Sequence, residues 1–263
     1  MSTLASAVGD SWTLTKRALV HWQREPMTPI AGVLFSFMFM VMFGFLFGGA
    51  MHVPGGGDYV DFVVPGILGM SMMFGLESTM LNVVQDKRAG LSDRFRAMPM
   101  SRSAVLGGRA VADVLDSVLN LVALVGCGLL IGWRFDASPA AFLLAMALLL
   151  LLRASMIWVG IFLGVVINSP DATALVQILV FPLGFVSSVF VPTSTMPGWL
   201  APVADWNPLS ATVAAVRELL SSPGTGGDAW AVDNAMLLAV AWPVVLAVVF
   251  GVLSVHGYRR LGR

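Results

Sequence analysis

Charged residues are scarce in this chain: they make up 11% of its 263 residues, while 57% are hydrophobic. Average soluble chains carry about 25% charged residues, so this composition excludes a water-soluble globular protein. Cysteine is almost absent too, and Cys127, standing alone, cannot form a disulfide within the chain. We therefore expect an all-α integral membrane protein, because a helix of about 20 apolar residues can cross a bilayer.

Motifs for catalysis and for nucleotide binding are also missing. No Gly-x-x-x-x-Gly-Lys-Ser/Thr run occurs, so the chain lacks the usual loop that holds nucleotide phosphates. His21, His52 and His256 fall on different segments, which argues against a metal cluster or a histidine-based triad. No Gly-x-Ser-x-Gly elbow occurs either. We expect neither an enzyme nor a bound metal or cofactor, and no nucleic-acid partner.

Apolar runs divide the chain into one membrane domain, residues 30–257, with a leading segment, 1–29, and a tail, 258–263. In the leading segment Trp12 and Trp22 fall on one helical face and Arg17 on the other, which is typical of an amphipathic helix in the membrane interface. This helix either moves during the working cycle or is a passive anchor. Six spans are predicted, at residues 30–50, 62–84, 111–133, 140–167, 174–191 and 231–256.

The basic residues are distributed unevenly between the two sides of this arrangement. Segments assigned to the inside hold twelve Lys and Arg, whereas the outside loops hold only Arg134 and Arg217. Basic loops remain on the cytoplasmic side. Both termini are therefore expected in the cytoplasm, which agrees with an even number of spans.

A polar island at residues 85–103 interrupts the apolar runs after the second span. Ser92 and Asp93 can start a short helix that Pro99 ends. Leu91 and Phe95 are four residues apart and would form one apolar edge, flanked by Arg94 and Arg96. The island is either a solvated loop that orients the protein or a docking helix for a soluble partner.

A few charged residues fall inside or beside the apolar runs: Glu77, Asp113, Asp116 and Arg153. Ionisable groups in a membrane are costly and often mark functional pathways. Arg153 can meet Asp116 across neighbouring helices more easily than it can meet Glu77, and Asp113 can pair with Arg109 four residues away. A structural ion pair fits this pattern better than a proton relay, which would need several aligned carboxylates.

Residues 192–230, between the fifth and sixth spans, are rich in helix breakers and in tryptophan. Irregular backbone at membrane depth is tolerated only where protein covers it. We therefore expect external re-entrant half-helices here. The residues that carry this interpretation are Pro192, Pro197, Trp199, Trp206 and Pro208.

Two stretches resemble a known family. Residues 90–109, GLSDRFRAMPMSRSAVLGGR, and residues 190–200, FVPTSTMPGWL, which continue to WNPLS at 206–210 and VREL at 216–219, are similar to membrane subunits of ABC type-2 exporters of the daunorubicin-resistance kind. The similarity extends over essentially the whole chain. It implies a permease subunit in the bacterial cell membrane that pairs with a second copy or a close relative.

The resemblance also implies a partner. Each permease would bind a separate cytosolic ATPase that holds ATP and Mg²⁺, through a coupling helix after the second span. Carried over to this sequence, the coupling residues are Gly90, Leu91, Ser92, Asp93, Arg94, Phe95, Arg96 and Met98. The second and fifth spans would line the path of a small hydrophobic or amphipathic substrate.

The cargo and the energy source leave alternatives open. The same architecture could export a drug or antibiotic, or the cell's own lipid, glycolipid or polyketide. An ATP-independent carrier or channel is a further alternative, but it would need aligned midplane charges or inverted repeats, and neither is evident.

Overall fold

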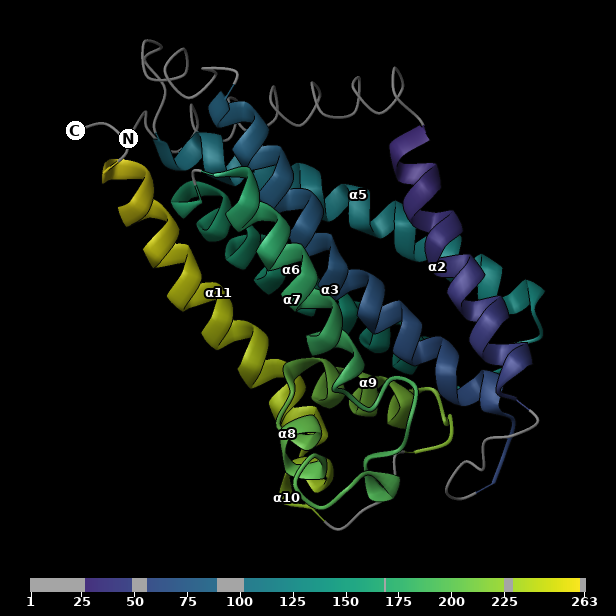
Figure 1. The fold of residues 1–263 in the computed structure, drawn as a ribbon. Helices are drawn as coiled ribbons and strands as arrows, with labels where there is room; N and C mark the ends of the chain where they lie inside the picture. Colours follow the sequence, from purple (N-terminus) through teal and green to yellow (C-terminus); the bar gives the residue numbers. More distant parts are fainter. Residues whose placement is uncertain (1–26, 49–55, 89–101, 168, 225–228, 261–263) are drawn as a thin grey trace.

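The computed structural model describes residues 27–48, 56–88, 102–167, 169–224 and 229–260, and in these ranges every regular element is a helix. The predicted interfacial helix at residues 1–29 and the predicted coupling helix at residues 90–98 lie outside the described residues, apart from residues 27–29. In chain order the elements are α2 (Met27–Leu46), α3 (Tyr59–Arg88), α5 (Arg102–Leu130), α6 (Pro139–Val166), α7 (Pro170–Phe185), η1 (Thr193–Thr195), α8 (Ala201–Asp205), α9 (Pro208–Leu219), α10 (Trp230–Asp233) and α11 (Ala235–Arg260) (Figure 1).

Four of the described helices, α3, α5, α6 and α11, are long and apolar enough to cross a membrane. They correspond to the predicted second, third, fourth and sixth spans. The predicted first and fifth spans correspond to α2 and α7, whose apolar stretches, Ile30–Leu46 and Ala172–Phe185, are shorter. The all-helical membrane fold is confirmed, and six complete crossings remain a prediction.

Serine and asparagine caps fix where three of the helices begin. Ser138 accepts a hydrogen bond from Ala141 N at the start of α6, and Ser169 accepts one from Ala172 N at the start of α7, both at 3.2 Å. Asn207 accepts one from Leu209 N at 2.9 Å at the start of α9. A proline follows each cap at the first helical position, where its missing N–H costs nothing.

Helix α7 ends at Phe185 rather than at residue 191, where the apolar run ends. The side chain of Asn207 donates from Nδ2 to the backbone oxygens of Leu183 (3.0 Å) and Val186 (2.7 Å). These bonds satisfy carbonyl groups that a longer helix would have used. Carbonyls at the end of α7 thus accept from Ser187, within the apolar run, and from Asn207, which is distant in sequence.

Helix α3 forms the centre of the bundle. In its most apolar 18-residue stretch 78% of the residues are buried, against 17% in the corresponding stretches of α5 and α11. It packs against α6 most extensively and also against α2, α5, α7 and α9. A helix so enclosed must be apolar on all sides, which is why its sequence has almost no amphipathic pattern.

Two glycines bring α3 and α6 into close contact. A Cβ atom at Gly160 would lie 2.7 Å from the backbone oxygen of Leu76, and one at Gly164 would lie 2.6 Å from Cβ of Val83. Gly-x-x-x-Gly pairs occur in this sequence about as often as chance predicts, so the motif alone does not single this one out. The structure shows that this pair is a helix contact.

The two ends of the bundle differ in character (Figure 1). At one end, which we call the basic end, α3 finishes with Lys87 and Arg88 and α11 finishes with Arg259 and Arg260. At the opposite end η1, α8, α9 and α10 form a cap. The positive-inside rule would place the basic end in the cytoplasm and the cap outside.

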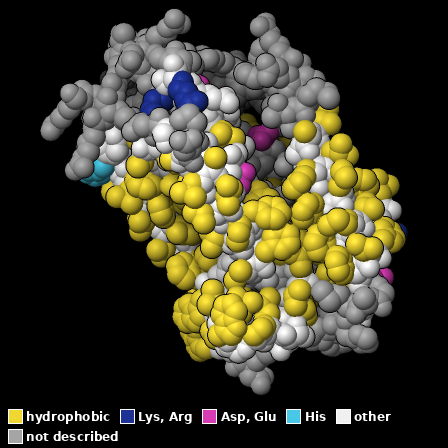
Figure 2. All heavy atoms as spheres, in the orientation of Figure 1, with side chains coloured by type: hydrophobic (Ala, Val, Ile, Leu, Met, Phe, Trp, Pro, Cys, Tyr) yellow, Lys and Arg dark blue, Asp and Glu magenta, His cyan; other side chains and the backbone are white. Residues whose placement is uncertain are grey.

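Large apolar side chains cover the outside of the bundle between these ends (Figure 2). They come mainly from α2, α5, α7 and α11, for example Leu34, Met38, Val122, Ile178 and Val248. Apolar patches of this extent are rare on soluble monomers. This surface fits a lipid environment and confirms a multi-pass membrane protein.

Candidate functional site

A buried polar cluster joins α3, α5 and α6 around Arg153, which is 2% exposed. Its Nε donates to Ser117 Oγ at 2.7 Å, and its Nη2 donates to Thr79 Oγ1 at 3.1 Å. Gly75 makes room for the guanidinium group, because a Cβ there would lie 2.5 Å from Arg153 Cζ. Arg153 therefore connects three helices in the middle of the bundle.

Aspartates on α5 balance this charge. Thr79 Oγ1 donates to Asp113 Oδ2 at 2.7 Å, so Thr79 links the arginine to the carboxylate. Ser117 Oγ donates to the backbone oxygen of Asp113 at 2.6 Å. The charge of Arg153 also interacts with Asp116. Hydrogen bonds and nearby opposite charges lower the cost of taking these charges out of water, while Arg153 Nη1 has no hydrogen-bond partner among the described residues.

Three of the four charged residues singled out in the sequence belong to the polar cluster, and the fourth, Glu77, does not. Arg153 is linked to Asp113 through Thr79. The charges of Asp113 and Asp116 stabilise the Arg153 cation. Glu77 is half-buried on α3, two residues before Thr79 and therefore on another side of the helix. Acidic side chains are visible in a hollow on one face of the molecule (Figure 2). The side chain of Arg109 lies outside the described part.

The polar cluster also depends on residues that the apolar pattern does not mark. Thr79 is a small hydroxyl residue inside an apolar run, and nothing in that run identifies it as a ligand of a guanidinium group. A signal does exist on α5, where Asp113, Asp116, Ser117 and Asn120 follow the spacing of one helical face. Such a polar stripe predicts a buried partner on a neighbouring helix.

The cap contains the proline- and tryptophan-rich residues predicted to be re-entrant. Pro192 precedes η1, Pro197 and Trp199 lie in the turn between η1 and α8, and Pro208 begins α9. Trp199 is 76% exposed. Trp206 is also exposed and stacks on Trp230, with ring centroids 5.8 Å apart. Exposed tryptophans suit a membrane interface; re-entry into the membrane remains a prediction.

Arg217 of α9 fixes the cap to the bundle. Its side chain is completely buried. It donates to the backbone oxygens of Phe62 (2.9 Å), Ser188 (2.8 Å) and Val189 (3.0 Å). The charge pattern of the sequence predicted only an external loop cation at this position. The signal for a buried site was its place among Val213, Val216 and Leu220, which are all fully buried.

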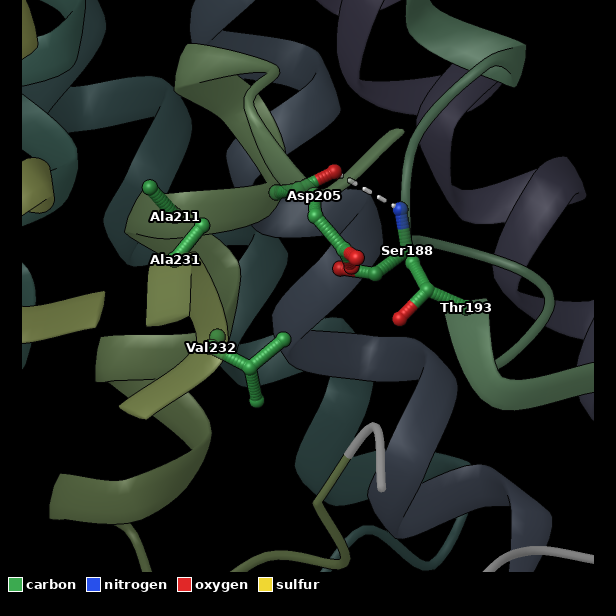
Figure 3. Close-up of a pocket in the computed structure, with 8 residues that line it drawn as sticks. Ser188, Thr193, Asp205, Ala211, Ala231 and Val232 are labelled. Atoms are coloured by element: carbon green, nitrogen blue, oxygen red, sulfur yellow. Dashed lines mark hydrogen bonds between the residues drawn. The ribbon is translucent and has the colours of Figure 1, made fainter. Parts of the chain in front are cut away.

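A small cavity lies inside the cap, between Ser188, Asp205 and α9 (Figure 3). The side chains of Ser188 and Asp205 point toward one another across it. Ser188 N donates to Ser210 Oγ at 2.9 Å. Ser188 Oγ and Asp205 Oδ1 are buried without a hydrogen-bond partner among the described residues. The cavity measures about 10 Å³, which suits one water molecule and is far too small for cargo.

Lys87, at the basic end, contacts the last turn of α6. Its Nζ donates to the backbone oxygens of Gly164 (3.3 Å), Val165 (2.9 Å) and Ile167 (2.7 Å). In the sequence Lys87 stands out only as one of the island's cations. Its contacts depend on how α3 and α6 pack, so the sequence offered no direct signal.

The predicted coupling residues, Gly90 to Met98, lie outside the described residues. The described helices on either side, α3 ending at Arg88 and α5 beginning at Arg102, both reach the basic end (Figure 1). Within the described ranges no group of three His, Cys, Asp or Glu side chains could hold a metal ion.

Comparison with known proteins agrees with this architecture. Residues 10–220 match the family model described as ABC-2 type transporter. The chain is 34% identical over 256 residues to the daunorubicin resistance ABC transporter permease protein DrrB1 of Streptomyces coeruleorubidus, covering 97% of this chain and 88% of the relative.

More distant relatives cover most of the chain as well. It is 24% identical over 269 residues to the probable doxorubicin resistance ABC transporter permease protein DrrC of Mycobacterium tuberculosis, covering 96% of this chain and 89% of the relative. It is 26% identical over 218 residues to the putative transport permease ycf38 of Cyanophora paradoxa, covering 81% and 75%. The chain belongs to the ABC-2 type transporter family of membrane permeases.

Proposed function

We propose that this chain is the membrane subunit of an ATP-driven exporter of amphipathic or hydrophobic compounds. The observation that carries the proposal is its similarity, over 97% of its length, to a permease named for daunorubicin resistance. The lipid-facing apolar surface of the bundle supports a function inside the membrane. The chain has no nucleotide-binding loop, so the energy would come from a separate cytosolic ATPase that binds ATP and Mg²⁺.

The coupling segment of the proposal is residues 90–98. Phe95 would provide an apolar side chain for a cleft on the ATPase, and Arg94 and Arg96 would surround it with charge, an arrangement that favours docking and specificity. The basic character of the helix ends on both sides of this segment supports a cytoplasmic position for it. ATP binding would bring two ATPases together and rock two permease subunits, so that cargo leaves between them.

Co-purification tests the coupling assignment. The chain is co-expressed with its partner ATPase, and the complex is captured through a tag on the ATPase. Phe95→Asp should abolish capture while the permease keeps its expression level and thermal stability. Met100→Asp places the same charge in the same polar island but outside residues 90–98, and should leave capture intact. An intact complex in Phe95→Asp would remove the assignment.

A second candidate function keeps the architecture and changes the cargo to an endogenous lipid, glycolipid or polyketide. It is kept as a candidate because neither the family description nor the name of the relative called putative transport permease specifies a cargo. Accumulation assays separate the two candidates. Cells that express both subunits should accumulate less of an amphipathic drug panel, whereas an exporter of endogenous lipid should change the lipid composition of the outer leaflet and leave the drugs unaffected.

A further inference from the structure

Lys87 is unusual among the described cations because three backbone carbonyls at the end of one other helix accept from its single ammonium group. The three bonds, to Gly164, Val165 and Ile167, span 2.7 to 3.3 Å. The last four carbonyls of an α-helix have no partner inside the helix, and a lysine there also complements the negative end of the helix dipole. Lys87 therefore closes the last turn of α6 from the side of α3.

This contact sits at the start of the turn that leads into α7. Ile167 is the C-cap residue of α6, and Ser169 already caps α7. The turn between the two helices is thus only a few residues long, and it cannot shift independently of the carbonyls that Lys87 holds. Any displacement of Lys87 along or across the membrane must act on this turn.

Close packing of α3 against α6, one helical turn before Lys87, makes the contact between Lys87 and α6 stiff. Val83, one helical turn before Lys87, lies against Gly164, where an added Cβ would be 2.6 Å from the valine. Packed helices without voids transmit displacement rather than absorb it. The end of α3 and the end of α6 are therefore expected to move as one body.

The opposite end of α7 is held as firmly. Asn207 of the cap donates to Leu183 and Val186 at the end of α7. A continuous line of specific contacts thus runs from Lys87, through the α6–α7 turn and along α7, to the cap. Coupling between distant sites needs such a chain of packed and hydrogen-bonded elements.

We propose that Lys87 is a positioning residue that transmits the movement of the ATPase-coupling segment, residues 90–98, to the α6–α7 turn and so to the cap. This inference rests on the proposed function, because it assigns a force to the segment that begins three residues after Lys87. Lys87 touches neither cargo nor nucleotide in this role. It acts through the helix that it caps.

The test compares efflux with ATP hydrolysis in the complete complex, reconstituted into lipid vesicles with the partner ATPase. The variants are Lys87→Met, which removes the donors, and Lys87→Arg, which keeps a cation able to reach the carbonyls. Arg88→Met is the matched control, since it removes the neighbouring exposed cation. Capture by the ATPase, thermal stability, ATPase rate and cargo efflux are measured for each.

Lys87→Met should keep the complex and its ATPase activity but export at least about fivefold less cargo per ATP hydrolysed, the low end of typical coupling energies. Lys87→Arg should restore the ratio, and Arg88→Met should match the parent. An unchanged ratio in Lys87→Met overturns the inference, and so does an equal loss in Arg88→Met.

Two further outcomes are decisive. If Lys87→Met is unstable, the ratio is read in Lys87→Gln, whose shorter, uncharged side chain has two N–H donors and cannot hold all three carbonyls; a parent-like ratio there overturns the inference. If the parent complex itself shows no ATP-dependent efflux, the proposed function has failed rather than the role of Lys87. If the parent complex transports cargo and the amount exported per ATP is the same in every variant, the proposed role of Lys87 is wrong while the proposed function stands.

Discussion

Arg217 and Phe62 are 155 residues apart in sequence, yet the arginine donates a hydrogen bond to the backbone of Phe62 and stacks on its ring. Nε donates to the Phe62 backbone oxygen at 2.9 Å, and the guanidinium carbon lies 3.6 Å from the centre of the Phe62 ring. Burial lowers the pKa of Arg217 to about 9, so the group stays protonated at neutral pH. One fully buried cation therefore fixes the cap to the first turns of α3, through carbonyl dipoles and an aromatic face.

Replacing Arg217 with Met should release the cap. Three buried carbonyls would lose their donor, and each unsatisfied group costs about 1–3 kcal/mol. We expect the midpoint of thermal unfolding in detergent to fall by at least about 5 °C, with new protease cleavage in residues 192–230. Arg134→Met removes an exposed arginine and should shift the midpoint by no more than about 2 °C. Equal shifts in the two variants would contradict the role of Arg217.

Replacing Arg153 with Met should lower the amount of folded protein more than it changes cargo choice. Asp113 and Asp116 would lose the cation that balances them, and removing one partner of a buried charged group costs about 3–5 kcal/mol. Membrane-inserted protein and its monodispersity in detergent measure this effect. Normal protein levels combined with an altered range of exported compounds would instead assign Arg153 to the cargo path.

An alanine at Gly164 should separate α3 from α6. Its Cβ would lie 2.6 Å from Val83, and overpacking of this kind costs about 1–3 kcal/mol. A Cβ added at Gly126 on α5 would have no neighbouring atom within 4 Å, so Gly126→Ala is the matched control. Thermal unfolding should show a clear loss for the first variant and none for the second. A stable Gly164→Ala would mean that the two helices are less tightly packed than the structure has them.

Cysteine labelling tests the orientation of the bundle. In a Cys127→Ala background, Trp206→Cys, at an exposed position of the cap, should react with a membrane-impermeant reagent added to intact cells. Arg88→Cys, at an exposed position of the basic end, should react only after the membrane is opened. The reverse pattern would place the basic end outside and contradict the positive-inside assignment.

The apolar runs predicted the helices well because each helix that crosses a bilayer needs its own stretch of apolar residues. The predicted spans at 62–84 and 140–167 correspond to α3 and α6 within a few residues. Helix ends were harder to predict where distant residues contact them: Asn207 donates to the backbone oxygens of Leu183 and Val186 at the end of α7. No periodicity along α7 contains that information.

The polar contacts were predictable only in part, since they depend on how the helices turn toward one another. The sequence pointed to Arg153 and the α5 aspartates, because charge inside an apolar run is conspicuous. It did not point to Thr79, whose hydroxyl joins Arg153 to Asp113, and its charge pattern assigned Arg217 to an external loop. Hydroxyls and backbone carbonyls become ligands only when packing aims them at a cation.

Transport by purified components tests the central claim most directly. Vesicles containing the permease and its ATPase, with ATP and Mg²⁺ on the ATPase side, should export an amphipathic cargo. Export should cease when the phosphate-binding lysine of the ATPase is replaced, although the complex stays assembled. Cargo movement at the same rate in vesicles that contain the permease alone would contradict the account.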